Sequence, residues 1–483
     1  MPARPILTVA EMAQADAAAV ASGISGFELM QRAGAAVAEI VCERFSPCPT
    51  VVYCGPGDNG GDGYVVATML RDRGWTVWIE CDGPPKSASA LQAAKAWGGE
   101  TLVLGQSERV ADLMIDALFG AGLARPLEGA SARLARLSEL MAERVVSIDL
   151  PSGLSGDTGR PIGDIGFWAG LTITFHARKI GHVLDPGSAR CGEVVVADIG
   201  LPPSDSRLIE NTPDAWLEHF PWPTATSHKH ARGRMVVVSG EVWSTGAARL
   251  SARAGLRLGA GLVTLLSPLE ALSVNAAHLE AVMLRPFETD LELEQLCADV
   301  DVAVIGPASG VTEATLQNTL ALARTGAALV IDADAITVFK DDPEELFSAL
   351  DVDDVLTPHA GEFERIFPGL MKAMPERISA TRRAAETADA VVLLKGFHTV
   401  VAHPDGRAAV SSNGSPWLAT AGSGDVLAGF IAALIAQGME SFQAACAAAW
   451  IHAEAAELHG PGLIAEDLPG LAPAILRRLY GDR

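Results

Sequence analysis

Short apolar runs that end in glycine-rich turns recur along this chain, and a helical pattern follows most of them. The run from Thr50 to Cys54 stops at GPGDNGGDG and leads into a helical pattern, and the run from Met235 to Ser239 leads into a segment rich in small residues. Runs of this length with β-branched residues favour buried strands, and strands that alternate with helices are typical of parallel, doubly wound sheets. The sequence therefore predicts an α/β fold.

The chain is long enough for two such sheets. Its 483 residues exceed what one hydrophobic core usually holds, and residues 202–227 are punctuated by proline and lack periodicity. We therefore predict an N-terminal domain at residues 1–213, a linker at 214–227 and a C-terminal domain at 228–483. Each domain is expected to be a three-layer α/β/α sandwich with a mostly parallel sheet.

The composition limits the classes of partner. A net charge of −23 disfavours nucleic acid and anionic membrane surfaces. The seven cysteines are dispersed without a Cys-x-x-Cys pair, which suits a reducing compartment. Glu11 and Asp16 interrupt the N-terminus, and no apolar run reaches the roughly 18 residues of a membrane helix. We expect a soluble, untargeted, cytoplasmic protein that does not bind a membrane.

The glycine-rich loop after Cys54 is the first candidate site. Gly55, Gly57 and Gly60 fit a dinucleotide-binding pattern, in which the backbone approaches a phosphate closely. The same loop contains Asp58, Asn59 and Asp62, which are polar ligands that the pattern does not require. The alternative is a glycine-rich turn stabilised by its own Asx-turns.

Two aspartates follow later apolar runs, each before glycines. Asp116 ends LMIDALFGAG and Asp149 ends VVSIDLPSG. The carboxyl ends of parallel strands face the crevice where ligands bind, so both residues should converge on the Gly55 loop. Either one alone could be a loop cap.

The stretch TAGSGDVLAGFIAALIAQG, from Thr420 to Gly438, is the strongest candidate in the C-terminal half. It predicts a glycine turn feeding a helix, whose N-terminal N–H groups suit a phosphate or an oxyanion. Asp425 would repel an anion in a passive pocket, which favours a general base. The alternative is a Ser or Asp helix cap followed by a buried helix.

Other polar residues stand at predicted strand ends of the same half. Lys395 could approach a phosphate, and His359 is either a ligand or a satisfied structural residue. Asp332 and Asp334 could hold magnesium or merely cap a helix. Because all of these face one crevice, we predict a second site there.

Several separated motifs of the N-terminal half, in order, resemble the NAD(P)H-hydrate epimerase domain: GPGDNGGDG, DALFGAGLARP, SIDLPSG, TFHARKIGH and VADIGLP, over roughly residues 8–210. The resemblance implies a Rossmann-like domain that interconverts the R and S hydrates of NADH and NADPH and binds potassium. It assigns proton transfer to Asp149 and potassium contacts to Asn59, Asp116 and Ser152. The family usually has Asn where this chain has Asp58. The implied hydrate contacts are Asp58, Asn59, Gly60, Gly61, Asp62, Gly120, Ala121, Gly122, Leu123, Ala124, Arg125, Pro126 and Asp149.

The motifs TPHAGEF, KGFHTVV and ATAGSGD resemble the ribokinase-like NAD(P)H-hydrate dehydratase domain over most of residues 228–480. The resemblance implies dehydration of the S-hydrate with ADP as co-substrate, a magnesium-dependent site and Asp425 as the base. GPASG (306–310) departs from the family's GPGLG, and Ala421 replaces a usual Gly. The implied hydrate contacts are Ala247, Gly310, His359 and Asp425, and the implied nucleotide contacts are Lys395, Gly396, Phe397, His398, Thr399 and Gly424.

Two other classes of protein compete with this interpretation. A sugar or vitamin kinase would share the fold and the GSGD turn, but it would transfer the terminal phosphate of ATP. A nucleotide sensor or scaffold would need only backbone amides, so Asp149 and Asp425 speak against it. We expect small-molecule substrates, NADHX or NADPHX and ADP, and a homo-oligomer.

Overall fold

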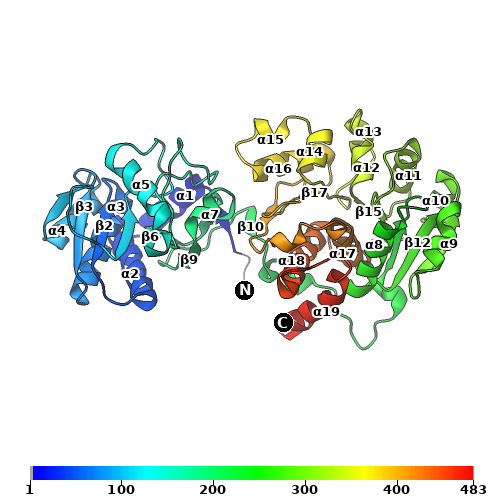
Figure 1. The fold of residues 1–483 in the computed structure, drawn as a ribbon, viewed down its shortest axis with the longest axis horizontal. Coiled ribbons are helices and arrows are strands. Elements are labelled where there is room, and N and C mark those ends of the chain that lie inside the picture. Colours follow the sequence, from blue (N-terminus) through cyan, green and yellow to red (C-terminus); the bar gives the residue numbers. More distant parts are fainter. Residues whose placement is uncertain (1–3, 482–483) are drawn as a thin grey trace. The chain divides into compact units, whose positions relative to one another are not determined.

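The computed structural model describes residues 4–481 and forms two compact units, one of Pro5–Ser206 and one of Arg4 with residues 207–481 (Figure 1). Both units are α/β folds with helices on both faces of a mostly parallel sheet, so the predicted fold class is confirmed. None of the helices in residues 4–481 combines the length and apolar character needed to cross a membrane.

In residues 5–206 the main sheet has seven parallel strands in the order β4-β3-β2-β5-β6-β7-β9. The order reverses between β2 and β5, so their carboxyl ends border the crevice where ligands bind in such sheets. The strands are β2 (Thr50–Cys54), β3 (Val77–Cys81), β4 (Thr101–Val103), β5 (Leu113–Ala117), β6 (Val145–Ile148), β7 (Leu171–Phe175) and β9 (Glu193–Ala197).

Alternate residues of β2 point to two different cores. Val52 and Cys54 pack in a core shared with helices α1 to α4, whereas Val51 and Tyr53 pack in a core shared with α5. This period of two is the expected consequence of a strand buried on both faces. The helices are α1 (Val9–Ala21), α2 (Gly26–Arg44), α3 (Asp58–Asp72), α4 (Ala88–Trp97), α5 (Gly129–Leu140), α6 (Ile180–Val183) and α7 (Gly187–Cys191).

A separate pair of short parallel strands anchors α1. Ile6 and Leu7 (β1, Ile6–Leu7) pair with Arg178 and Lys179 (β8, Arg178–Lys179), and both residues of β1 are fully buried. Thr8 then caps α1 through a capping box with Glu11. This pairing fixes where α1 lies, next to a segment far away in the sequence.

In residues 207–481 the sheet has ten strands in the order β10-β19-β18-β17-β16-β15-β14-β11-β12-β13, with β18 antiparallel to both its neighbours. The order reverses between β11 and β14. The strands are β10 (Leu208–Glu210), β11 (Arg234–Val238), β12 (Leu262–Pro268), β13 (Met283–Phe287), β14 (Val302–Ile305), β15 (Ala328–Ile331), β16 (Val355–Leu356), β17 (Val391–Leu394), β18 (Val400–Ala402) and β19 (Ala408–Val410).

Helices α8 and α17 to α19 form one core with the sheet, and α10, α11 and α16 contact strands as well. Nearly the whole of α17 after its first turn is buried, so the helix predicted for this stretch belongs to the core. The helices are α8 (Thr245–Leu258), α9 (Leu272–Ala276), α10 (Asp290–Leu296), α11 (Glu313–Ala323), α12 (Asp334–Thr337), α13 (Pro343–Phe347), α14 (Ala360–Ile366), α15 (Leu370–Ala373), α16 (Arg377–Ala388), α17 (Ser423–Ala436), α18 (Ser441–His459) and α19 (Leu468–Gly481).

The segment predicted as a linker, residues 214–227, begins inside the second unit. Trp216 is 1% exposed in the main core, and its indole N–H donates to Asn211 at 3.1 Å. β10 precedes it and pairs with β19. The structure thus divides the chain between residues 206 and 207, because a three-residue strand and one aromatic anchor attach this proline-rich stretch to the second core.

Candidate active sites

A cavity of about 950 Å³ lies at the reversal point of the first sheet. The loop after β2, the loop after β5 and the residue after β6 all contribute to it, as expected for carboxyl ends of parallel strands. Of the residues predicted to contact a substrate, those that line the cavity are Asp58, Asn59, Asp62, Gly120, Ala121, Gly122, Leu123, Ala124, Arg125 and Asp149.

Three predicted contacts do not line the cavity. A Cβ on Gly60 would stand 1.8 Å from the carbonyl oxygen of Gly55, and one on Gly61 would stand 2.4 Å from the Met30 side chain. These two glycines therefore allow α3 to pack closely, and their contact with a substrate stays a prediction. Pro126 packs near Gly163.

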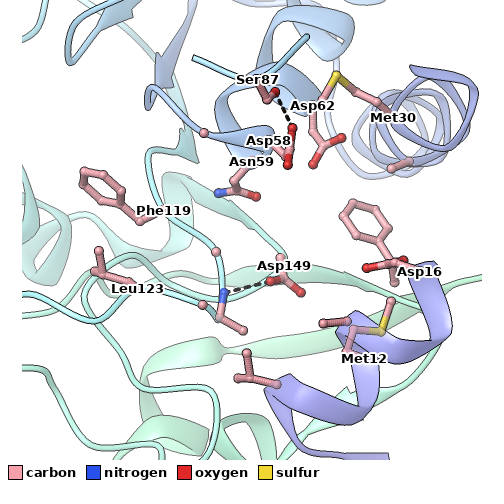
Figure 2. A pocket seen from close by; sticks show the side chains of 18 of the residues that line it. Met12, Asp16, Met30, Asp58, Asn59, Asp62, Ser87, Phe119, Leu123 and Asp149 are labelled. Atoms are coloured by element: carbon pink, nitrogen blue, oxygen red, sulfur yellow. Dashed lines mark hydrogen bonds between the residues drawn. The ribbon is translucent and has the colours of Figure 1, made fainter. Parts of the chain in front are cut away.

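Asp149 projects into this cavity from a left-handed backbone conformation, with φ 67° (Figure 2). Its Oδ2 accepts the Ala121 N–H at 2.9 Å, and its Oδ1 accepts from Lys179 Nζ at 2.9 Å and from Thr174 Oγ1 at 3.1 Å. Burial alone would raise the pKa of Asp149, but the Lys179 ammonium and the donated hydrogen bonds lower it to about 2. This carboxylate is held ionised.

A neutral histidine holds the backbone of Asp149. His182 Nδ1 accepts the Lys179 N–H at 2.8 Å, so the proton is on Nε2, which donates to the Asp149 carbonyl at 2.7 Å. Burial and then the neighbouring Lys179 lower the pKa of His182 to about 4, which keeps the ring neutral. The strained residue is therefore fixed by both its side chain and its carbonyl.

Asp116 and Ser152 lie behind the cavity wall, fully buried. The Asp116 carboxylate accepts from the Ser152 N–H at 2.8 Å, from Ser152 Oγ at 2.6 Å and from Ser147 Oγ at 3.0 Å. Burial raises the pKa of Asp116 to about 6 despite these bonds. Asn59 lines the cavity itself, and both polar atoms of its amide are buried without a hydrogen-bond partner in residues 4–481.

The departure at Asp58 has a structural use. Its Oδ1 accepts the Ser87 hydroxyl at 2.5 Å, and Ser87 is the N-cap of α4. Asp58 is also the first residue of α3, where a carboxylate is favoured by the helix dipole. The negative charge is therefore used to join two helix N-termini.

Sequence reasoning assigned no role to several residues of this cavity. Lys179 is the main one, since it is 2% exposed and paired with Asp149. It falls within the motif TFHARKIGH, so a search for cations near the aspartates would have found it. α1 and α2 also supply wall residues, which have no local signal; they include Met12, Asp16, Leu29 and Met30.

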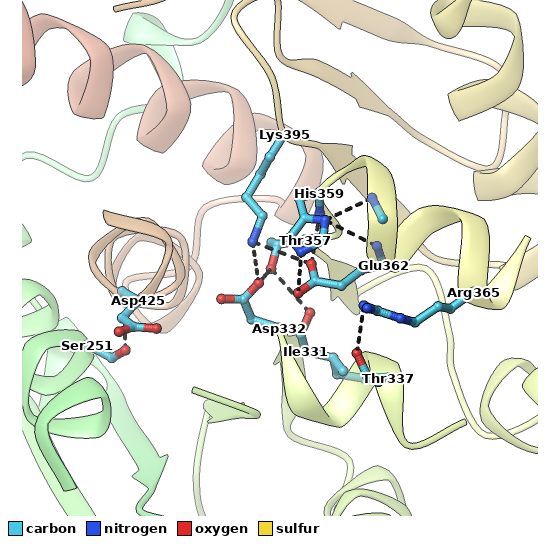
Figure 3. A network of polar contacts seen from close by, with 11 residues as sticks. Ser251, Ile331, Asp332, Thr337, Thr357, His359, Glu362, Arg365, Lys395 and Asp425 are labelled. Carbon is cyan, nitrogen blue, oxygen red and sulfur yellow. Dashed lines mark hydrogen bonds and ion pairs between the residues drawn. The ribbon is translucent and has the colours of Figure 1, made fainter. Parts of the chain in front are cut away.

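The second site is built at the carboxyl ends of β15, β16 and β17 (Figure 3). Lys395, directly after β17, places its Nζ 2.6 Å from Asp332 Oδ1 and 3.9 Å from Glu362 Oε2. Thr357 Oγ1 donates to the same oxygen of Asp332 at 2.8 Å. Burial acts to lower the pKa of Lys395, but Asp332 and Glu362 outweigh it and raise the pKa. The ammonium is thus stabilised by these two carboxylates.

Asp425 lies in the first turn of α17, facing this network (Figure 3). Its pKa is raised to about 7, first by burial and then by the charge of Asp332. Gly422 is the N-cap, with φ +88°, and no side chain caps this helix in the described chain. The interpretation of this stretch as a Ser or Asp helix cap is therefore wrong, because Ser423 Oγ donates backwards to the carbonyls of Leu418 and Thr420.

Gly424 stands beside both charged partners. A Cβ added there would lie 3.4 Å from Lys395 Nζ and 3.6 Å from Asp332 Oδ2, and would meet nothing else within 4 Å. Lys395, Gly424 and Asp425 are therefore brought together as the sequence predicted.

The remaining predicted contacts surround this group. Ser251 Oγ donates to the carbonyls of Ala247 at 3.3 Å and Asp425 at 2.7 Å, which ties α8 to the glycine turn. The Gly310 N–H donates to Asp334 at 2.9 Å. His359 caps α14, with Nδ1 accepting from the Gly361 and Glu362 N–H groups. Residues 396–399 form the loop from β17 to β18, in which Phe397 is exposed and His398 is buried.

The two departures from the dehydratase pattern differ physically. Ala308 has φ +50°, a left-handed conformation that a side chain disfavours, whereas Ala421 is not among the residues with positive φ. Only the first replacement of glycine strains the backbone.

Comparison with known proteins agrees with this geometry. Residues 26–181 match the family model described as YjeF-related protein N-terminus, and residues 235–466 match the model described as NAD(P)H-hydrate dehydratase. A bifunctional NAD(P)H-hydrate repair enzyme of Moorella thermoacetica is 35% identical over 98% of this chain and 97% of its own length. A bifunctional NAD(P)H-hydrate repair enzyme of Salinibacter ruber is 33% identical over 99% of this chain and 97% of its own length.

A solved structure supports the fold of the second unit. The crystal structure of a ribokinase-like superfamily protein from Enterococcus faecalis aligns with a TM-score of 0.51 and 23% identity, covering 58% of this chain and 98% of that one. Together with the full-length relatives, the two matched models show that this chain belongs to the bifunctional NAD(P)H-hydrate repair enzymes, with an epimerase domain followed by a dehydratase domain.

Proposed function

We propose that the cavity of residues 5–206 binds the R and S hydrates of NADH or NADPH, and that Asp149 carries out the proton transfer at the damaged nicotinamide ring. The observation that carries this proposal is the ionised Asp149 carboxylate, which is paired with buried Lys179 and lines the cavity. A base needs its unprotonated form at neutral pH, and this environment maintains it. The left-handed backbone and the His182 contact keep the carboxylate oriented before substrate arrives.

The epimerase domain is further proposed to hold potassium through Asn59, Asp116 and Ser152. These residues fit the ion, because the Asn59 amide oxygen is buried without a partner and a hydroxyl and a carboxylate complete an oxygen donor set. When bound, potassium would supply positive charge that offsets the buried Asp116 carboxylate. Asn59 would then be oriented where the α3 N-terminus meets the cavity.

In the dehydratase domain, Asp425 is proposed as the base that takes the proton of the hydrate hydroxyl. The freed oxygen attacks the β-phosphate of ADP and AMP leaves, and phosphate then departs as the adjacent ring carbon gives up a proton and the ring double bond is restored. A carboxylate with a pKa of about 7 is suited to this step, since it both accepts and returns a proton near neutral pH. The uncapped N–H groups of α17 and the Lys395 ammonium would stabilise charge on the transferring phosphoryl group.

Magnesium is proposed to enter this site with the nucleotide. No group of three or more His, Cys, Asp or Glu side chains in residues 4–481 is arranged to hold a metal ion, and Asp332 is already paired with Lys395. Magnesium is commonly bound by one or two carboxylates together with substrate phosphates. Asp332 and Asp334 could supply those carboxylates. The ion would neutralise phosphate charge when bound. The cytoplasmic location and the homo-oligomer remain predictions.

The test is an assay of the full chain with mixed R and S NADHX, with and without ADP, followed at the absorbance of the reduced nicotinamide. Recovery of the whole mixture only with ADP is expected. Asp149→Asn should leave the R fraction unrepaired while S is still repaired, and Asp425→Asn should stop all repair. A phosphorylated product formed from ATP instead would support the kinase alternative, and loss of both activities in a folded Asp149→Asn protein would contradict two separate sites.

A further inference from the structure

Four aspartates line the epimerase cavity, and two of them, Asp62 and Asp149, differ sharply in their contacts (Figure 2). Asp62 projects from α3, and Asp149 follows β6. Asp149 accepts three hydrogen bonds, one of them from an ammonium. The Asp62 side chain is half-buried and makes no hydrogen bond or ion pair with any residue in 4–481. One carboxylate is thus fully supplied with donors, and the other has none.

The surroundings push the two groups toward opposite protonation states. Burial raises the pKa of Asp62, and the charges of Asp149, Asp58 and Asp16 raise it well above its ordinary value. The cations that line the cavity are Lys86, Arg125 and Lys179, and the buried one, Lys179, is bound to Asp149 rather than to Asp62. Asp62 therefore keeps its proton over a pH range in which Asp149 is ionised. A pair of carboxyl groups separated in this way is typical of an acid and a base acting on one substrate.

Epimerisation at a carbon that bears a hydroxyl beside a ring nitrogen needs such a pair. The hydroxyl must leave from one face and return to the other, so one group has to donate a proton and another has to accept one. A single carboxylate on one side of the ring does not serve both faces.

We propose that Asp62 is the second catalytic residue of the epimerase, acting as the general acid opposite Asp149. The inference rests on the proposed function of this cavity. Asp62 donates its proton to the ring hydroxyl, the carbon–oxygen bond breaks, and the ring nitrogen lone pair forms a carbon–nitrogen double bond as water leaves. A second water molecule adds to the opposite face, the double bond returns to the nitrogen as a lone pair, and Asp149 accepts the excess proton. In the reverse direction Asp149 is the acid and Asp62 is the base. The two carboxyl groups together hold the same number of protons in either direction.

Asp16 provides a matched control. It also lines the cavity, on α1, it has no hydrogen bond or ion pair in the described chain, and burial raises its pKa. Asp58 is a poorer control because Ser87 occupies one of its oxygens. Comparing Asp62→Asn with Asp16→Asn therefore separates a specific proton transfer from the general acidity of the cavity.

The experiment measures kcat and KM for epimerisation of R-NADHX by the full chain. S-NADHX is dehydrated as it forms by adding ADP and an excess of the Asp149→Asn protein. The residual epimerase activity of that protein is measured separately as the background. Asp62→Asn should lower kcat by about 100-fold or more with KM changed only a few-fold, while Asp16→Asn stays within a few-fold of the parent in both. Dehydration of S-NADHX should be unchanged in both variants.

The pH profile gives a second measure that a structural role would not move. The kcat/KM of the parent should fall at alkaline pH as Asp62 loses its proton. Asp62→Asn should not show this fall at alkaline pH. A rise in KM alone would make Asp62 a binding residue, and an unchanged kcat would also overturn the inference. If Asp149→Asn also epimerised at the parent rate, the proposed function of the cavity would itself be wrong.

Discussion

The Lys179 ammonium lies 2.9 Å from Asp149 Oδ1, with the lysine side chain only 2% exposed. The same Nζ donates to Thr174 Oγ1 at 2.8 Å and to the Phe175 carbonyl at 3.3 Å, so all three of its protons are used. This pair sets the protonation state of the residue on which the epimerase proposal depends.

Lys179→Met should therefore destabilise the first unit and impair epimerisation together. Removing one partner leaves a buried charge, which typically costs about 3 kcal/mol. The folded pKa of Asp149 is below its unfolded value of 3.8, so its contribution to stability is present above pH 3.8 and is lost as pH falls toward about 2. Urea unfolding of parent and variant should differ most at neutral pH and converge in acid. Lys86→Met, at an exposed lysine of the same cavity, is the control and should unfold like the parent.

Much of this site could be predicted from the sequence, because ligands bind at the carboxyl ends of parallel strands. Asp149, Asn59 and the Gly120 loop follow strands of one parallel sheet, and the structure brings them to one cavity. Asp16 could not be placed this way, because the helix that carries it is positioned by contacts between distant segments, such as the pairing of β1 with β8. The start of the second unit was missed for the same reason, since β10 is three residues long and is stabilised by β19 and Trp216.

Replacing potassium with a non-binding organic cation should slow epimerisation and leave dehydration unchanged. Asn59, Asp116 and Ser152 supply oxygen donors without the dense carboxylate cluster that a divalent ion favours. Initial rates of both reactions at constant ionic strength measure the effect. An epimerisation rate indifferent to the cation would contradict this ligand set.

Ala308→Gly should stabilise the second unit. The alanine is held at φ +50°, where a Cβ is disfavoured by roughly 1 kcal/mol, and the greater freedom of glycine in the unfolded chain offsets only part of that gain. An increase in thermal midpoint of about 1–2 °C is expected. Ala421→Gly is the matched control, since Ala421 does not have positive φ, and it should lower the midpoint or leave it unchanged. Equal shifts in the two variants would rule out backbone strain as the cause.

The Asp425 carboxyl predicts opposite pH effects on activity and on stability. Dehydration should increase as pH rises through about 7, because the base must be ionised. Its folded pKa lies above the unfolded 3.8, so its contribution to stability is complete below pH 3.8 and is lost as pH rises through about 7. Asp425→Asn should accordingly lower the rate by about 100-fold or more while melting at a higher temperature than the parent at pH 8, an advantage that disappears near pH 4. If Asp425→Asn dehydrated the substrate at the parent rate, Asp425 would have only a structural role.

Gly424→Val tests the nucleotide half of the dehydratase site. An added Cβ meets only Lys395 Nζ at 3.4 Å and Asp332 Oδ2 at 3.6 Å, so the protein itself leaves room for a Cβ at this position. The valine methyl groups would occupy the space between the α17 N-terminus and Lys395, where the proposal places a phosphate. ADP affinity measured by calorimetric titration should fall by 10-fold or more, roughly the effect of losing one charge-assisted contact. Gly424→Ala, which adds only the Cβ, should show a smaller loss, and Asp425→Asn should bind ADP like the parent. If Gly424→Val bound ADP undiminished, the phosphate would have to lie elsewhere in the crevice, and the uncapped turn would serve only to start a buried helix.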